Sequence, residues 1–139
     1  MTNALLQPVI IMAAWTFVVM LWMFQKRIPA MNEAKIDVQD AMHTSEVAPK
    51  LPSDVRAVGD NYNHLHEQPT IFYAVALLIA AAGHADGLFV QLAWAFVALR
   101  IVHSLIQNTY NNVMHRFGVF IISWLVLGVM IFREIMNLF

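Results

Sequence analysis

Four long apolar segments constrain the fold of this chain more than any other feature. They cover about residues 5–24, 69–83, 88–106 and 117–132. A helix needs about 20 apolar residues to cross the hydrocarbon core of a bilayer, and the first and third segments have that length on their own. Of the 139 residues 60% are hydrophobic and 12% are charged, against about 25% charged in a typical soluble domain. We therefore predict an all-α integral membrane protein whose segments pack as a four-helix bundle.

The second apolar segment is too short to cross a bilayer unless its helix begins upstream. Ser53 and Asp54 follow Pro52 and are residue types that cap a helix N-terminus. A helix from there to Gly83 would be kinked at Pro69. The sequence thus predicts a single transmembrane domain over residues 1–139, with a loop at about 26–52 and spans at about 5–25, 54–83, 88–108 and 116–137.

Lysine and arginine lie mainly in the connections that follow the first and third segments. The first connection holds Lys26, Arg27, Lys35 and Lys50, and the third holds Arg116, whereas the turn at 83–87 holds none. By the positive-inside rule these two connections are cytoplasmic and both termini lie outside. We expect a multi-pass protein of a bacterial inner membrane with this orientation.

Charge and cysteine content exclude some classes of function. The formal net charge is −1, so no basic surface for nucleic acid is expected. The chain has no cysteine, which excludes disulfides and a protein thiol nucleophile. Any thiol chemistry would need a thiol supplied by a cofactor or a substrate.

Polar side chains form a stripe along one face of each of the two central helices. On the second helix the stripe has the spacing i, i+4, i+7 and i+11 and consists of Arg56, Asp60, Asn63 and Glu67. On the third helix it consists of Arg100, His103, Gln107, Tyr110 and Asn111. Arg116 opens the fourth segment on the same side. Because polar groups are costly inside a membrane, the two stripes predict a polar cavity that faces the cytoplasm.

The residue types in these stripes indicate the chemistry of a ligand. Arginine suits carboxylates, and Glu67 suits an ammonium group, so a small zwitterionic ligand fits the set. A structural alternative is that Arg56 pairs with Asp60, and Glu67 with Arg100, only to hold helices together. A third hypothesis is a redox protein that binds haem through His66 and His103. Since the E-x-x-H pairs of bundle metal sites are missing, we predict no metal site.

One block of the second helix and one of the third resemble a known family. The block Asn61-Tyr62-Asn63-His64-Leu65-His66-Glu67-Gln68-Pro69-Thr70-Ile71-Phe72, followed by Arg100-Ile101-Val102-His103, is similar to the MAPEG family (membrane-associated proteins in eicosanoid and glutathione metabolism). The resemblance extends over all four spans and suggests a bacterial-type member. It implies a homotrimer that binds glutathione, or another low-molecular-weight thiol, between neighbouring subunits.

The resemblance also implies roles for individual residues. Arg116 matches the arginine that stabilises the glutathione thiolate, and Tyr110 is a candidate donor to the sulfur. The ligand-binding residues implied by the motifs are Arg56, Asn63, Glu67, Arg100 and His103. The chain departs from the family pattern with Gly59 in place of an arginine, His66 in place of a glutamate and Gln107 in place of a tyrosine.

Two functions follow from this resemblance. The first is a glutathione-dependent membrane transferase or peroxidase that acts on a hydrophobic electrophile or peroxide drawn from the bilayer. The alternative is a non-catalytic protein with the same bundle that binds a lipid or a membrane-protein partner. The departures at His66 and Gln107 favour the alternative.

Overall fold

The computed structural model describes residues 1–139 and contains only helices and turns. The long helices are α1 (Thr2–Glu33), α3 (Ser53–His64), α4 (Gln68–Ala82), α5 (Gly87–Asn108) and α6 (Val113–Leu138). Three short elements join α1 to α3, namely η1 (Gln39–Ala41), α2 (Thr44–Val47) and η2 (Ala48–Lys50). With α3 and α4 taken together, four helical segments are long and apolar enough to cross a membrane. The prediction of an all-α four-helix membrane bundle is confirmed.

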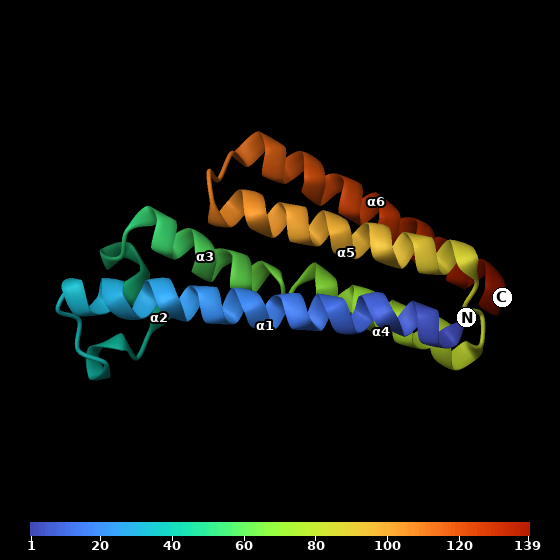
Figure 1. The fold of residues 1–139 in the computed structure, drawn as a ribbon, viewed down its shortest axis with the longest axis horizontal. Helices are drawn as coiled ribbons and strands as arrows, with labels where there is room; N and C mark the ends of the chain where they lie inside the picture. The colour runs from blue at the N-terminus through green and yellow to red at the C-terminus, as the bar shows by residue number, and fades with distance from the viewer.

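The helices run back and forth along one axis (Figure 1). α1 extends over the whole length of the molecule, α3 and α4 follow one another along it, and α5 and α6 form a hairpin. Both termini and the α4–α5 turn lie at one end, here called the terminal end. The short elements lie at the opposite end, here called the loop end, and the α5–α6 turn points toward it.

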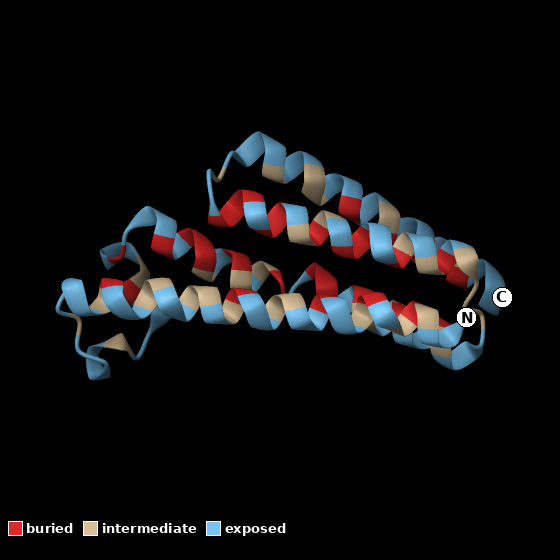
Figure 2. Ribbon diagram, viewed as in Figure 1, coloured by how far each residue is buried: buried red, intermediate tan, exposed pale blue.

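The main apolar core runs along the axis of the bundle. Leu5, Met12 and Val19 of α1 are fully buried and recur every seven residues, which places them on one face of the helix. The rings of Phe72 and Phe96 stack in this core with their centroids 4.4 Å apart. The outer faces stay exposed (Figure 2) and carry large apolar side chains, among them Ile10, Phe17, Leu125 and Phe132. Such a surface suits contact with lipid.

The second membrane segment is broken directly before its proline. α3 ends at His64 and α4 begins at Gln68, with Glu67 at φ −94° and ψ −94°. Pro69 has no N–H group for the carbonyl four residues earlier, and its ring crowds that carbonyl. The backbone of the break forms i→i+3 hydrogen bonds instead, including one from Glu67 N–H to the His64 carbonyl at 3.3 Å. The break leaves that carbonyl oxygen available to a second donor.

The two ends are built differently. At the loop end α1 continues to Glu33, because Ala30 packs with Val47, Leu51 and Val55 in a small second core. At the terminal end Gly83 closes α4 at φ +77°, a left-handed conformation that favours glycine. Asp86 then caps α5 by accepting a hydrogen bond from Phe89 N–H at 3.0 Å.

Candidate functional site

The polar stripe of α3 lies on the outside of the bundle. Arg56, Asp60 and Asn63 are exposed, and so is Glu67 in the break that follows α3. The opposite face of α3 is buried and consists of Val55, Ala57, Val58 and Asn61. The four stripe residues therefore share one face, as their spacing indicates. That face is turned away from the core of this chain.

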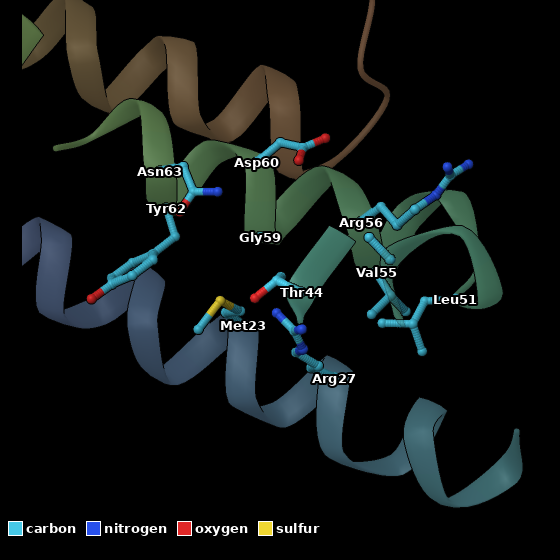
Figure 3. A pocket seen from close by; sticks show the side chains of 11 residues that line it. Met23, Arg27, Thr44, Leu51, Val55, Arg56, Gly59, Asp60, Tyr62 and Asn63 are labelled. Carbon is cyan, nitrogen blue, oxygen red and sulfur yellow. The ribbon is translucent and has the colours of Figure 1, made fainter. Parts of the chain in front are cut away.

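A cavity of about 190 Å³ lies between α1, the short elements and α3, and is here called the α3 cavity. Its polar lining includes Arg27, Thr44, Arg56, Asp60 and Asn63. Arg27 points from α1 into the cavity toward Thr44, whereas Arg56 and Asp60 extend away from α1 (Figure 3). Neither arginine forms an ion pair.

A second cavity of about 190 Å³ lies where the break after α3 meets α5 and the first turns of α6, and is here called the α6 cavity. It is lined by His64, His103, Val113, Arg116, Phe117 and Phe120. Arg116 is anchored by a hydrogen bond from its Nη1 to Asn111 Oδ1 at 2.8 Å. The rings of His64 and His103 stand 6.1 Å apart, centroid to centroid. The α6 cavity thus combines one guanidinium and two imidazoles with an apolar wall.

A buried polar network lies behind the α6 cavity. Arg100 is completely buried, and its Nη1 donates to Gln68 Oε1 at 3.2 Å. Its Nη2 donates to the His64 carbonyl at 3.3 Å. Ser123 of α6 also donates to Gln68 Oε1, at 3.0 Å, and shares its proton with the Phe120 carbonyl at 2.7 Å. The network joins α4, α5 and α6 through neutral acceptors alone.

Sequence reasoning missed most of this network. Gln68 and Ser123 were not singled out, nor was the buried hydrogen bond from Ser104 Oγ to Asn61 Oδ1 at 3.1 Å. An isolated serine in an apolar segment is a weak signal, because it often bonds to its own helix. Gln68 directly precedes Pro69, and an uncharged side chain at that position gives no sequence signal of a buried acceptor. One signal was available. The third membrane segment carries Arg100 but no acidic residue at helical spacing from it, so the hydrogen-bond acceptors of a buried Arg100 must come from other helices.

Of the seven predicted site residues, only Arg116 and His103 line the α6 cavity in this chain. Tyr110 is 62% exposed, and its hydroxyl lies 3.3 Å from His115 Nδ1. Glu67 Oε2 lies 3.0 Å from His64 Nδ1. Neither of the two ion pairs of the structural alternative, Arg56 with Asp60 and Glu67 with Arg100, is formed.

The histidines do not converge on one point. His66 Nδ1 lies 2.8 Å from the Tyr62 carbonyl oxygen, and its ring packs edge-on against the Tyr62 ring. His103 is buried on α5 with an unpartnered Nδ1. No group of three or more histidine and acidic side chains is arranged to hold a metal ion.

The fold and this site define a class of protein. It is an integral membrane four-helix bundle with a cationic polar site at one end, formed around a broken second segment and the start of the fourth helix. The chain matches the family model of the MAPEG family over residues 5–136 and therefore belongs to this family. Comparisons with curated proteins and with solved structures found no match.

Proposed function

We propose that this chain is a glutathione-dependent membrane transferase or peroxidase acting on a hydrophobic electrophile or peroxide. The observation that carries the proposal is the donor set of the α6 cavity. Arg116 contributes a guanidinium beside the apolar side chains of Phe117 and Phe120. The completely buried guanidinium of Arg100 lies behind the same cavity. Positive charge next to an apolar surface suits an anionic sulfur that must meet a hydrophobic partner.

The residues present fit glutathione on chemical grounds. The peptide carries two carboxylates and one ammonium group, and the outward stripe offers Arg56 for a carboxylate and Glu67 for the ammonium. Asn63 on the same face can donate to and accept from the peptide backbone. When bound, glutathione supplies the thiol that attacks an electrophile or reduces a peroxide. Another low-molecular-weight thiol with the same charged groups would fit equally.

Arg116, His103 and Tyr110 have different roles in this proposal. Arg116, held by Asn111, places positive charge at the α6 cavity and favours the ionised thiol over the neutral one. His103 forms a wall of the same cavity, and its buried Nδ1 has no hydrogen-bond partner. Tyr110 reaches the sulfur in this proposal only after its hydroxyl leaves His115.

The outward direction of the α3 stripe supports a shared site between subunits. Arg56, Asp60 and Glu67 are exposed on a segment long and apolar enough to cross a membrane. Charges that face lipid are costly, so they need water, a ligand or a second protein surface. We propose a homotrimer in which the stripe faces the neighbouring subunit and glutathione lies between them on the cytoplasmic side.

The test is a thiolate difference spectrum of the purified protein in detergent, titrated with glutathione at neutral pH. We expect a saturable thiolate signal that is lost in Arg116→Ala while the oligomer measured by light scattering stays unchanged. Lys50→Ala, which removes an exposed charge of the loop end, is the matched control and should keep the signal. S-methylglutathione should bind without any thiolate signal. An undiminished signal in Arg116→Ala would exclude the role of that residue.

A second candidate function is a non-catalytic lipid-binding or partner-binding member of the family. The observation that favours it is the exposure of Tyr110 together with Gln107 at a buried position of α5, where its Oε1 has no hydrogen-bond partner. In this case purified protein would show no thiolate signal and no binding of S-methylglutathione. Mass spectrometry of the purified protein would instead find a lipid retained at a fixed ratio to the chain.

A further inference from the structure

Arg100 is a buried cation without a counterion. Its side chain is completely buried, its Nε has no hydrogen-bond partner, and its two bonded nitrogens donate to neutral oxygens. Glu67 attracts it electrostatically, but that carboxylate is 65% exposed and pairs with His64 instead. Buried charges in proteins are normally paired, because removing an isolated charge from water is very costly. This site therefore lacks one negative charge.

The unneutralised charge acts on the α6 cavity. Arg100 and His103 stand three residues apart on α5 and so lie on the same face of the helix. His103 lines the cavity together with the guanidinium of Arg116. Arg100 Nη2 also bonds to the backbone of His64, the residue on the opposite wall. In a low-dielectric surrounding a nearby unneutralised charge acts strongly on a bound ion.

The acceptor that fixes Arg100 is the amide oxygen of Gln68. That oxygen takes donors from α5 and from α6, so it determines where the guanidinium stands. The other end of the amide, Nε2, is buried and makes no hydrogen bond. A glutamate at this position would keep the accepting oxygen, lose no hydrogen bond and neutralise Arg100. A glutamine at this position instead leaves Arg100 fully charged.

We infer that Gln68 is a positioning residue, which holds the Arg100 guanidinium behind the α6 cavity without neutralising it, so that a bound anion supplies the missing negative charge. In this role Gln68 makes the α6 cavity selective for anionic ligands. The inference rests on the proposed function only for the identity of that anion. The excess of positive charge follows from the buried network itself.

The experiment compares Gln68→Glu with Gln68→Met and with the wild-type protein. In the absence of ligand, Gln68→Glu should melt at a higher temperature than the wild type, because it pairs a buried charge. Gln68→Met should melt lower, because Arg100 loses an acceptor. Gln107→Glu, the same change at a second buried glutamine, is the matched control and should melt lower, because its new charge gains no hydrogen-bonded cation.

Binding is then measured by calorimetry with glutathione and with S-methylglutathione as probes. We expect Gln68→Glu to weaken binding of both probes by about tenfold or more, because the charge that attracted them is neutralised. Gln68→Met should weaken it by less than about threefold, since Arg100 stays charged. The inference predicts that Gln68→Glu gains stability and loses affinity. If Gln68 had only a structural role, its substitution would lower both stability and affinity, or neither.

The outcomes separate this inference from the proposed function. If wild-type protein binds neither probe, the glutathione proposal fails, and the melting temperatures of the variants decide the inference alone. A lower melting temperature for Gln68→Glu than for wild type would overturn it. If wild type binds glutathione and Gln68→Glu binds it equally well, the proposed function stands and the inference is wrong.

Discussion

The charged side chains at the terminal end of this bundle are paired with one another, whereas several toward the loop end have no partner. At the terminal end Asp86 and Arg133 form two hydrogen bonds of 2.7 and 2.5 Å, and His84 Nδ1 lies 3.0 Å from Glu134 Oε1. Toward the loop end Arg56 and Asp60 pair with nothing, and Arg100, on the middle turns of α5, is buried against neutral oxygens. Two solvent-accessible pairs are the exceptions there, Lys26 with Asp54 and His64 with Glu67.

This difference separates structural charges from charges that are available to a ligand. Charges that satisfy one another hold helix ends together, and removing one of them costs stability. Charges that are left without partners cost stability where they stand, and removing one should cost ligand binding instead. The comparison therefore predicts opposite responses to the same kind of substitution at the two ends.

The largest effect is expected for Arg100→Met beside the break in the second membrane segment. Ligand affinity should fall by about 2–3 kcal/mol, roughly a hundredfold, because a buried charge partner of the anion is removed. The melting temperature without ligand should stay level or rise, since an unpaired buried charge is replaced by an apolar chain of similar length. Gln68 Oε1 and the His64 carbonyl keep their other donors, Ser123 and Glu67. Titration calorimetry and thermal melting in the same detergent would measure both effects.

A clear fall in melting temperature for Arg100→Met would contradict the comparison, because it would place Arg100 among the structural charges. Lys26→Met is a suitable control for this variant. It removes a cation of the loop end that does have a partner, Asp54, in a pair that is partly exposed. We expect less than about 1 kcal/mol of lost stability there and no loss of affinity.

The next effect in size is expected for His84→Ala at the terminal end. Glu134 is only 3% exposed and its Oε2 has no partner, so His84 provides the hydrogen bond to its other oxygen. Losing that bond should cost about 2 kcal/mol of stability and leave glutathione affinity unchanged. A double-mutant cycle with Glu134→Leu measures the pair directly. Equal losses in the single and double variants would support the pairing, whereas additive losses would show that the two side chains act independently.

The parts of the fold that could be predicted are those that depend on local sequence. The four membrane segments were readable because hydrophobic length is a local property of a chain. The break before Pro69 was readable for the same reason, since a missing N–H acts on the residues around it. The shared face of Arg56, Asp60 and Asn63 also follows from helical spacing alone.

The direction of that face was not predictable. We expected the two stripes to form one polar cavity. In the structure the α3 stripe faces outward and lines the α3 cavity with Arg56, Asp60 and Asn63, because Val55, Val58 and Asn61 occupy the inner face. Helical periodicity gives the angle between two faces but not which one meets a neighbouring helix. Contacts such as Gln68 with Arg100, or His84 with Glu134, join residues 32 and 50 positions apart. Only tertiary packing brings such residues together.

A smaller effect is expected for Arg56→Ala on the outward stripe. The side chain is exposed and forms no ion pair within the chain, so the melting temperature of the isolated subunit should hardly change. If Arg56 binds a carboxylate of glutathione between subunits, affinity should fall by about tenfold. Lys35→Ala, a second exposed cation of the loop end, should leave affinity unchanged. An unchanged affinity in Arg56→Ala would remove this residue from the proposed site.

The smallest effect is expected for Asp86→Asn, and its pH dependence is the informative part. The hydrogen bond from Arg133 holds the pKa of the Asp86 carboxyl well below its usual range, and the bond from Phe89 N–H adds to this. A carboxyl with a lowered folded pKa stabilises the protein above its unfolded pKa of about 3.9, and this contribution is lost as the pH falls through the folded pKa.

Wild type should therefore melt above Asp86→Asn by at most about 3 °C between pH 5 and 8, because the pair is partly exposed. The difference should shrink as the pH falls below about 4. Melting curves of both proteins over this range, at low and at high salt, provide the measurement. A difference that persists unchanged at pH 2–3 would mean that the charge of Asp86 does not cause it, and it could not come from the cap either, because asparagine caps a helix as well as aspartate does. In that case the contrast of the terminal end with the loop end would rest on His84 and Glu134 alone.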